Sequence, residues 1–125
     1  MIANDWDRLR TLPVTIEAVS TRVLERQVSA DFTRLTTVVE LAGDTFVGVG
    51  EDVTYDGAEH APVRFPSPRL AGTWTLESLS KHLDGFDLFP AGEPQQAAYR
   101  DYRRWAFESA ALDLALRSEE HTSEL

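Results

Sequence analysis

The sequence of 125 residues contains no cysteine. This absence excludes disulfides, thiolate metal ligands and cysteine nucleophiles. No run approaches the roughly 20 apolar residues of a membrane-spanning helix, and the N-terminal MIANDWDRLR lacks the apolar stretch of a signal peptide. The sequence therefore predicts a soluble, cytoplasmic protein without membrane contact.

Positive charge is also scarce. Twelve Lys and Arg residues stand against 21 Asp and Glu residues, which gives a formal net charge of −9 and a pI near 4.7. An acidic chain of this kind is repelled by nucleic-acid phosphates, so we expect no nucleic-acid partner. The length suits one domain with a modest core.

Motifs of established catalytic chemistry are missing too. The chain has no H-E-x-x-H, no G-x-S-x-G and no twelve-residue calcium loop, and Gly48-Val49-Gly50 lacks the third glycine of a dinucleotide loop. We therefore predict no catalytic residue and no metal ligand in this chain.

The densest polar cluster combines carboxylates with an imidazole, a chemistry that could bind a metal or support a small enzyme. Its spacing fits no metal motif, and charge clusters of this kind usually lie in solvent. We interpret it as a solvated acidic loop, made of Glu51, Asp52, Asp56, Glu59 and His60.

The first half of the chain has the alternating pattern of strands. Apolar residues alternate from Val14 to Val23, and the pattern changes parity at Ala18–Val19, which indicates a bulge or a bend. Further strands are predicted over Phe32–Leu41 and Thr45–Val53, joined by the polar connection Gln27–Asp31 and the hairpin loop Ala42–Asp44. The product is a three-stranded antiparallel meander.

Two glycines, Gly48 and Gly50, share one face of the third strand with Phe46. Glycine inside a strand often marks the close approach of another backbone or of a ligand. We favour a packing helix as the neighbour.

The second half is predicted to be helical after an irregular stretch over residues 54–74. Thr75 is the expected N-cap of a helix that ends at Gly85. After the linker Ala91–Gln96, a main helix begins near Ala97. The fold class is therefore α+β, with a polar lead-in over 1–13 and a domain over 14–116.

The main helix is apolar on two sides. Nine of the twelve residues from Trp105 to Leu116 are apolar. One stripe consists of Phe107, Ala110, Ala111 and Leu114, and another side carries Trp105, Leu112 and Leu116. A helix that is apolar on most sides normally lies between two bodies. The preceding residues supply only one body, so we expect a second that lies outside this chain.

The last nine residues, RSEEHTSEL over 117–125, have no apolar periodicity. The codons AGA-TCG-GAA-GAG-CAC-ACG-TCT-GAA-CTC encode this peptide, and that string resembles the start of a common short-read sequencing adapter. We interpret the tail as translated adapter, with a natural acidic helix extension as the alternative.

Two motifs recur in one known family, in this order: Gly48-Val49-Gly50-Glu51 at the end of the third strand and FESAALDLAL over Phe107–Leu116. Together with the order of elements, they resemble the N-terminal capping domain of the enolase superfamily, of the mandelate racemase and muconate lactonizing enzyme type. The resemblance covers about Val14 to Leu116.

The resemblance implies a mechanism located outside this chain. Such enzymes are lyases and isomerases (racemases, dehydratases, cycloisomerases) that bind Mg²⁺ through three carboxylates of a C-terminal (β/α) barrel and remove the α-proton of a small carboxylate substrate. The barrel would be the missing partner within the same polypeptide. The fragment alone would be inactive.

The resemblance also implies two specificity loops over the barrel mouth. By position these are Gln27–Asp31 and the stretch from Asp52 to Arg69, with Tyr55, His60 and Phe65 as the side chains expected to face substrate. The alternative is a complete small α+β binding module without catalysis, and a homo-oligomer is compatible with either interpretation.

Overall fold

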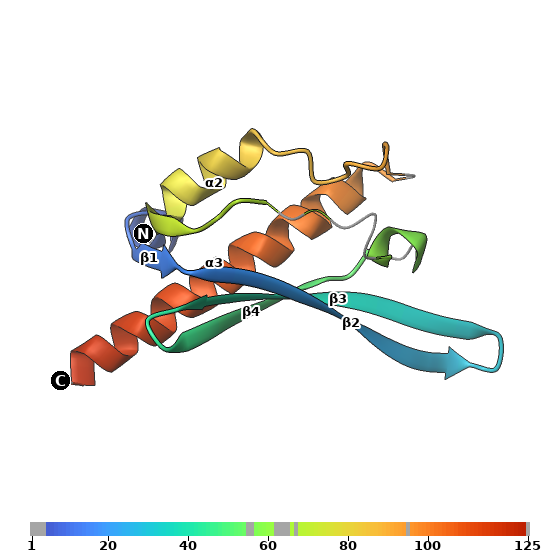
Figure 1. Cartoon of the computed structure of the whole chain (residues 1–125), viewed down its shortest axis with the longest axis horizontal. Coiled ribbons are helices and arrows are strands. Elements are labelled where there is room, and N and C mark those ends of the chain that lie inside the picture. Colours follow the sequence, from blue (N-terminus) through green and yellow to red (C-terminus); the bar gives the residue numbers. More distant parts are fainter. Residues whose placement is uncertain (1–4, 55–56, 62–65, 67, 95, 125) are drawn as a thin grey trace.

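A computed structural model describes residues 5–54, 57–61, 66, 68–94 and 96–124, the last four of these by their backbone alone. Figure 1 shows one sheet crossed by one long helix, with shorter elements on the helix side. The elements in chain order are α1 (Asp5–Leu9), β1 (Pro13–Ile16), β2 (Ala18–Ser29), β3 (Phe32–Gly43), β4 (Phe46–Asp52), η1 (Gly57–His60), β5 (Gly72–Thr75), α2 (Leu76–Asp84) and α3 (Ala98–Glu124).

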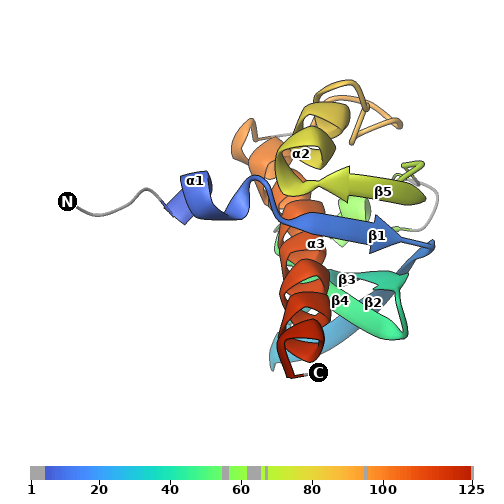
Figure 2. The same cartoon turned by 90° about the vertical axis from the view of Figure 1, so that its left-hand side faces the viewer.

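The predicted α+β class and the antiparallel meander are confirmed. The main sheet has the order β2-β3-β4, with both pairs antiparallel. The long helix α3 runs along one face of this sheet, and α2 lies beside it (Figures 1 and 2). None of the helices in the described part of the chain combines the length and apolar character that a membrane span needs.

The change of parity near Ala18–Val19 has a different origin from a bulge within one strand. The chain leaves a two-stranded sheet after Ile16 and enters the main sheet at Ala18. Glu17 lies between the two, and its N–H donates to the Ala42 carbonyl at 2.7 Å. The partner of β1 is β5, a strand that the sequence analysis assigned to irregular structure.

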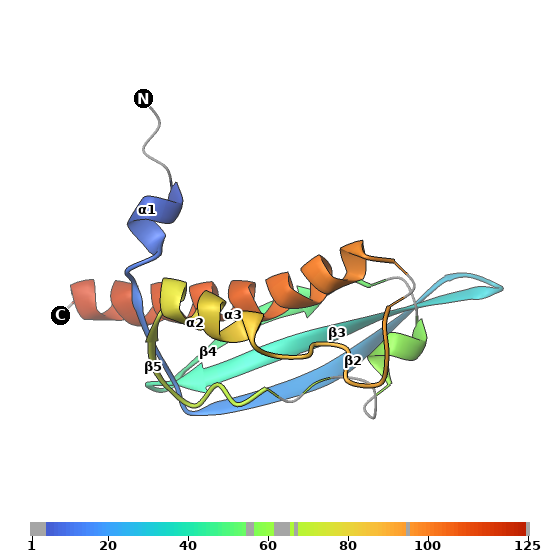
Figure 3. The same cartoon turned by 90° about the horizontal axis from the view of Figure 1, so that it is seen from above.

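The connection predicted over Gln27–Asp31 is shorter than expected. Strand β2 continues to Ser29 and β3 begins at Phe32, with a register shift between Gln27 and Ser29. The resulting hairpin extends well beyond the N-terminal end of α3 (Figure 3). At the next hairpin the turn residues are Asp44 and Thr45, both with positive φ (50° and 70°), one position later than predicted.

The glycines of β4 are where the helix touches the sheet. A Cβ on Gly48 would lie 2.1 Å from the Ala110 carbonyl oxygen, and one on Gly50 would lie 2.0 Å from that of Ala106. No side chain fits at such distances, so the helix backbone rests directly on the strand. The packing-helix interpretation of these glycines is confirmed.

The core lies between the sheet and α3. The predicted helix stripe is fully buried there: Phe107, Ala110, Ala111 and Leu114 each have 0% exposure. These side chains meet the inward face of the strands and the apolar side of α2, through Val14, Ile16, Val39, Leu41, Leu76, Leu79 and Leu83.

Helix α2 begins as its sequence predicts. The Thr75 side chain accepts a hydrogen bond from the Ser78 N–H at 3.1 Å, and the Ser78 hydroxyl accepts one from the Thr75 N–H at 3.0 Å. Two further N-terminal N–H groups, of Leu76 and Glu77, donate to carbonyls of the segment after α1. At the other end Gly85 caps the helix, as predicted, and it does so in a right-handed conformation with φ −86°.

Candidate functional site

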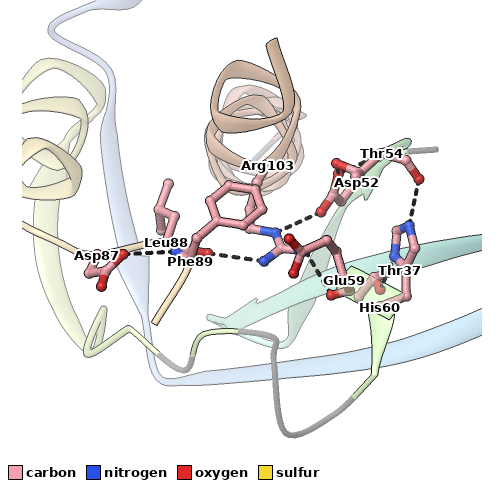
Figure 4. Close-up of polar contacts among 9 residues, drawn as sticks. All are labelled: Thr37, Asp52, Thr54, Glu59, His60, Asp87, Leu88, Phe89 and Arg103. Carbon is pink, nitrogen blue, oxygen red and sulfur yellow. Dashed lines mark hydrogen bonds and ion pairs between the residues drawn. The ribbon is translucent and has the colours of Figure 1, made fainter. Parts of the chain in front are cut away.

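The loop after β4 is held by a buried polar network (Figure 4). Three of its side chains come from three different elements: Asp52 ends β4, His60 ends η1 and Arg103 lies on α3. Asp52 and Arg103 are 0% exposed and His60 is 1% exposed. The solvated-loop interpretation is therefore wrong for Asp52 and His60, and also for Glu59, which is buried as well.

Arg103 connects three segments of the chain. Its Nε donates to Asp52 Oδ2 at 2.8 Å, its Nη1 to the Leu88 carbonyl at 3.0 Å and its Nη2 to the Glu59 carbonyl at 2.9 Å. The guanidinium also lies 4.1 Å from the centre of the Phe89 ring, a cation–π geometry. One side chain of α3 thus fixes the end of β4, η1 and the segment after α2.

The second oxygen of Asp52 organises the start of the loop. Oδ1 accepts hydrogen bonds from the Thr54 N–H at 3.0 Å and from the Thr54 hydroxyl at 2.6 Å. Both carboxylate oxygens are therefore engaged within the chain, one by Arg103 and one by Thr54. A buried ion pair is tolerated when its remaining polar atoms are satisfied in this way.

His60 ties the loop to the sheet. Its Nε2 lies 2.7 Å from the Thr54 carbonyl oxygen, which can only accept, so Nε2 carries a proton. Its Nδ1 lies 2.7 Å from Thr37 Oγ1 on β3, and in the neutral ring this nitrogen accepts from the hydroxyl. Both ring nitrogens are thus bonded to groups of this chain.

The side chains predicted to face substrate have different outcomes. His60 is described, and its ring is buried and doubly bonded, so its contacts hold the loop in place. Tyr55 and Phe65 lie outside the described residues. Of the second predicted loop, the described element η1 lies against β3, at the same end of the molecule as the hairpin turn between β2 and β3 (Figures 1 and 3).

The described residues do not fit a magnesium site. In this part of the chain no three His, Asp or Glu side chains are grouped so that they could hold a metal ion. Asp52 directs both oxygens to Arg103 and Thr54, and Glu51 is exposed on the opposite face of β4. We derive no catalytic step through a metal in this domain.

The outer side of α3 is apolar and open. Trp105 is 56% exposed and Leu116 is 45% exposed, which confirms a second apolar side for these two residues. The Trp105 ring continues a row with Tyr102, whose ring centroid is 6.1 Å away. Leu112 is half-buried and packs against the core.

A shallow hollow adjoins this outer side. It has a volume of about 150 Å³ and lies between α1, α2 and α3, with Trp6, Leu9, Leu76, Leu79, Ala111 and Leu112 among its lining residues. Helix α1, which forms one wall of the hollow, stands away from the rest of the molecule (Figure 2). The hollow therefore extends the apolar surface of α3 toward the N-terminus.

Arg103 was not among the predicted site residues, because in the sequence it lies beside two further arginines, Arg100 and Arg104, ahead of the apolar part of α3. Its neighbours Arg100 and Arg104 do lie toward solvent, where they pair with Glu93 and Asp84. A signal was present in the sequence, since Arg103 precedes the buried positions Phe107, Ala110 and Leu114 at helical spacing.

The fold and the network define a small α+β domain, in which one helix lies on a glycine-lined sheet and anchors an adjacent loop. The chain belongs to the family described as the N-terminal domain of DUF8230, a domain of unknown function, which matches residues 7–124. This span includes residues 117–124, so the domain of that family continues past Leu116. Comparisons with curated proteins and with solved structures gave no match.

Proposed function

We propose that this chain is the N-terminal capping domain of a larger enzyme of the enolase-superfamily type. In this proposal a (β/α) barrel follows this domain in the same polypeptide, covers the outer side of α3 and supplies the Mg²⁺ ligands and the proton-abstracting base. The observation that carries the proposal is the exposed apolar side of α3, with Trp105 and Leu116 opposite the buried stripe. The description of the family as an N-terminal domain supports it.

The size of this surface favours a protein partner. Aromatic side chains bury roughly 150–250 Å² each when covered, so the row from Tyr102 to Leu116 with its adjoining hollow offers a few hundred Å². Patches of that size on monomers often mark interaction sites. A following domain of the same polypeptide would cover it without the entropic cost of a separate association.

The anchored loop suits a role in substrate selection. Arg103, Asp52 and His60 hold the described parts of the segment after β4 in place, and a backbone that is already held binds a small ligand at lower entropic cost. The substrate class proposed is a small carboxylate, and the reaction is a racemisation, dehydration or cycloisomerisation. In this domain His60 acts through the position of the loop.

The test uses the extended polypeptide, cloned from its source across the codon for Leu116. We expect it to exchange the α-hydrogen of a carboxylic acid for deuterium in the presence of Mg²⁺, and we expect the present chain to show no exchange. An extended polypeptide without exchange on a broad set of small carboxylates would contradict the enzymatic part of the proposal.

A fluorescence measurement separates the capping geometry from the chemistry. In a background of Trp6→Phe and Trp74→Phe, Trp105 is the only remaining tryptophan. Acrylamide should quench it readily in the present chain and weakly in the extended polypeptide. Equal quenching in both would favour the alternative, a small binding module whose partner occupies the hollow beside α3.

A further inference from the structure

The two edges of the main sheet differ in how they are protected. At the β4 edge, the outward N–H of Val49 donates to Asp113 Oδ2 of α3 at 2.9 Å. At the other edge, every residue of β2 from Ser20 to Ser29 is exposed. In the described part of the chain, β3 is the only element against which β2 packs extensively. The β4 edge is therefore engaged by α3 at Val49, whereas among the described residues no strand pairs with the outer edge of β2, and open edges pair with further strands.

The direction of the free backbone groups on β2 follows from Val49. Alternate residues of an antiparallel strand direct their N–H and C=O groups to opposite sides. The backbone N–H and C=O groups of Val49 point away from β3. Those of its partner Glu40 therefore point to β2, where Glu40 faces Ser20. Ser20 and every second residue after it bond to β3, which leaves open the N–H and C=O groups of Thr21, Val23 and Glu25.

We propose that β2 is the site at which a second copy of this chain pairs, antiparallel, around a two-fold axis at Val23. In this register Val23 faces Val23 of the other copy, and Thr21 faces Glu25. The open N–H and C=O groups of both strands then bond each other, and the two three-stranded sheets join into one. The interface is isologous, as in most protein dimers.

The charged side chains of β2 favour this register over the neighbouring ones. An axis at Arg22 or at Glu25 places that residue opposite its own copy, and an axis at Leu24 places Arg22 opposite Arg26. Like charges directly opposite each other destabilise a strand pair. Of these four central registers, only the axis at Val23 avoids them, because Arg22 then faces Leu24 and Arg26 faces Ser20.

The side chains at the axis gain burial. Val23 is 40% exposed and Leu24 is 42% exposed, so a strand paired at this edge would cover apolar surface of both. The surface is separate from the outer side of α3, and the proposal does not depend on the capping function.

Cysteine cross-linking tests the register, because the chain has no cysteine of its own. The Cα atoms of a hydrogen-bonded antiparallel pair lie about 5.5 Å apart, within the roughly 4.4–6.8 Å that a disulfide spans. Two copies of Leu24 would be diagonal neighbours, about 7–8 Å apart. We expect Val23→Cys to form covalent dimers at least about tenfold faster than Leu24→Cys. Equal rates, or faster cross-linking at Leu24, would overturn the proposal.

Sedimentation of the chain and of a proline variant tests the pairing itself. Val23→Pro removes the N–H at the axis and leaves the bonds to β3, whereas Val23→Thr keeps the N–H and the shape of the side chain. We expect a reversible dimer whose dissociation constant rises at least about tenfold in Val23→Pro and changes little in Val23→Thr. A chain that stays monomeric up to about 1 mM, or a dimer that Val23→Pro leaves unchanged, would overturn the proposal.

Discussion

Replacing Arg103 by methionine should cause one of the largest losses of stability available to a single substitution in this domain. The side chain is fully buried, and its three hydrogen bonds reach Asp52, Leu88 and Glu59. Methionine fills much of the same volume but leaves the Asp52 carboxylate buried without its cation. The Leu88 and Glu59 carbonyls lose a charged donor at the same time.

The expected magnitude follows from the uncompensated charge. Removing one partner of a buried ion pair costs about 3–5 kcal/mol, a large part of the roughly 5–15 kcal/mol that stabilises a domain. Arg100→Met is the matched control, because it lies on the same helix and pairs with Glu93 while 45% of its side chain is exposed. Exposed pairs contribute about 0–1 kcal/mol.

Urea unfolding followed by far-ultraviolet circular dichroism measures both variants. We expect Arg103→Met to lower the free energy of unfolding by about 3–5 kcal/mol and Arg100→Met by less than about 1 kcal/mol. Adding Asp52→Asn to Arg103→Met should restore part of the loss, because the unpaired charge is then gone. Equal, small effects of the two arginine substitutions would refute the assignment of Arg103 as the anchor of the loop.

Four further substitutions test three other parts of the structure by the same unfolding assay. Gly50→Ala should lower the free energy of unfolding by at least about 1–3 kcal/mol, because its Cβ would lie 2.0 Å from the Ala106 carbonyl oxygen. Gly57→Ala is the control and should lower it little, because among the described residues its Cβ meets only Leu35. Thr45→Gly should raise stability, because Thr45 has φ 70°; an unchanged or lower stability would contradict that turn. The Arg10 guanidinium donates a hydrogen bond to Glu77, and this bond lowers the pKa of the Glu77 carboxyl in the folded chain below 4.5. The pair therefore stabilises the folded chain above pH 4.5, and this stabilisation is lost as the pH falls through the lowered pKa of the folded state. Glu77→Gln should therefore lose less stability than the parent chain on acidification, and equal losses would contradict the pairing.

The sequence was sufficient to predict the features that depend on residues close together in the chain. Alternation predicted the meander, the pair Gly48 and Gly50 predicted the helix packed on the sheet, and Thr75 predicted the start of α2. Each of these features depends on residues within one element or on a backbone contact that only glycine allows. The exposed side of α3, marked by Trp105 and Leu116, was predictable for the same reason.

Features that depend on distant partners could not be predicted. Strand β5 is only four residues long, and its partner β1 lies almost 60 residues earlier in the chain. The acidic loop was interpreted as solvated because the cation that pairs with Asp52 is Arg103, 51 residues later. A charge cluster and a buried network have the same composition, and only the position of the partner distinguishes them.

The origin of residues 117–125 stays a prediction, although their backbone continues α3 as far as Glu124. Arg117 bonds back to Asp113 in the preceding turn, at 3.2 Å. A peptide rich in Glu and Ser extends a helix readily whatever its source. The helix therefore does not distinguish adapter from natural sequence.

Sequencing the source locus across the codon for Leu116, in independent genomic reads, tests the central claim most directly. We expect the reading frame to diverge from RSEEHTSEL and to continue into alternating strands and helices, with a Lys-x-Lys motif and three spaced carboxylates. A stop codon directly after Leu125 would contradict it. The exposed side of α3 would then belong to a separate partner, and the chain would be a binding module.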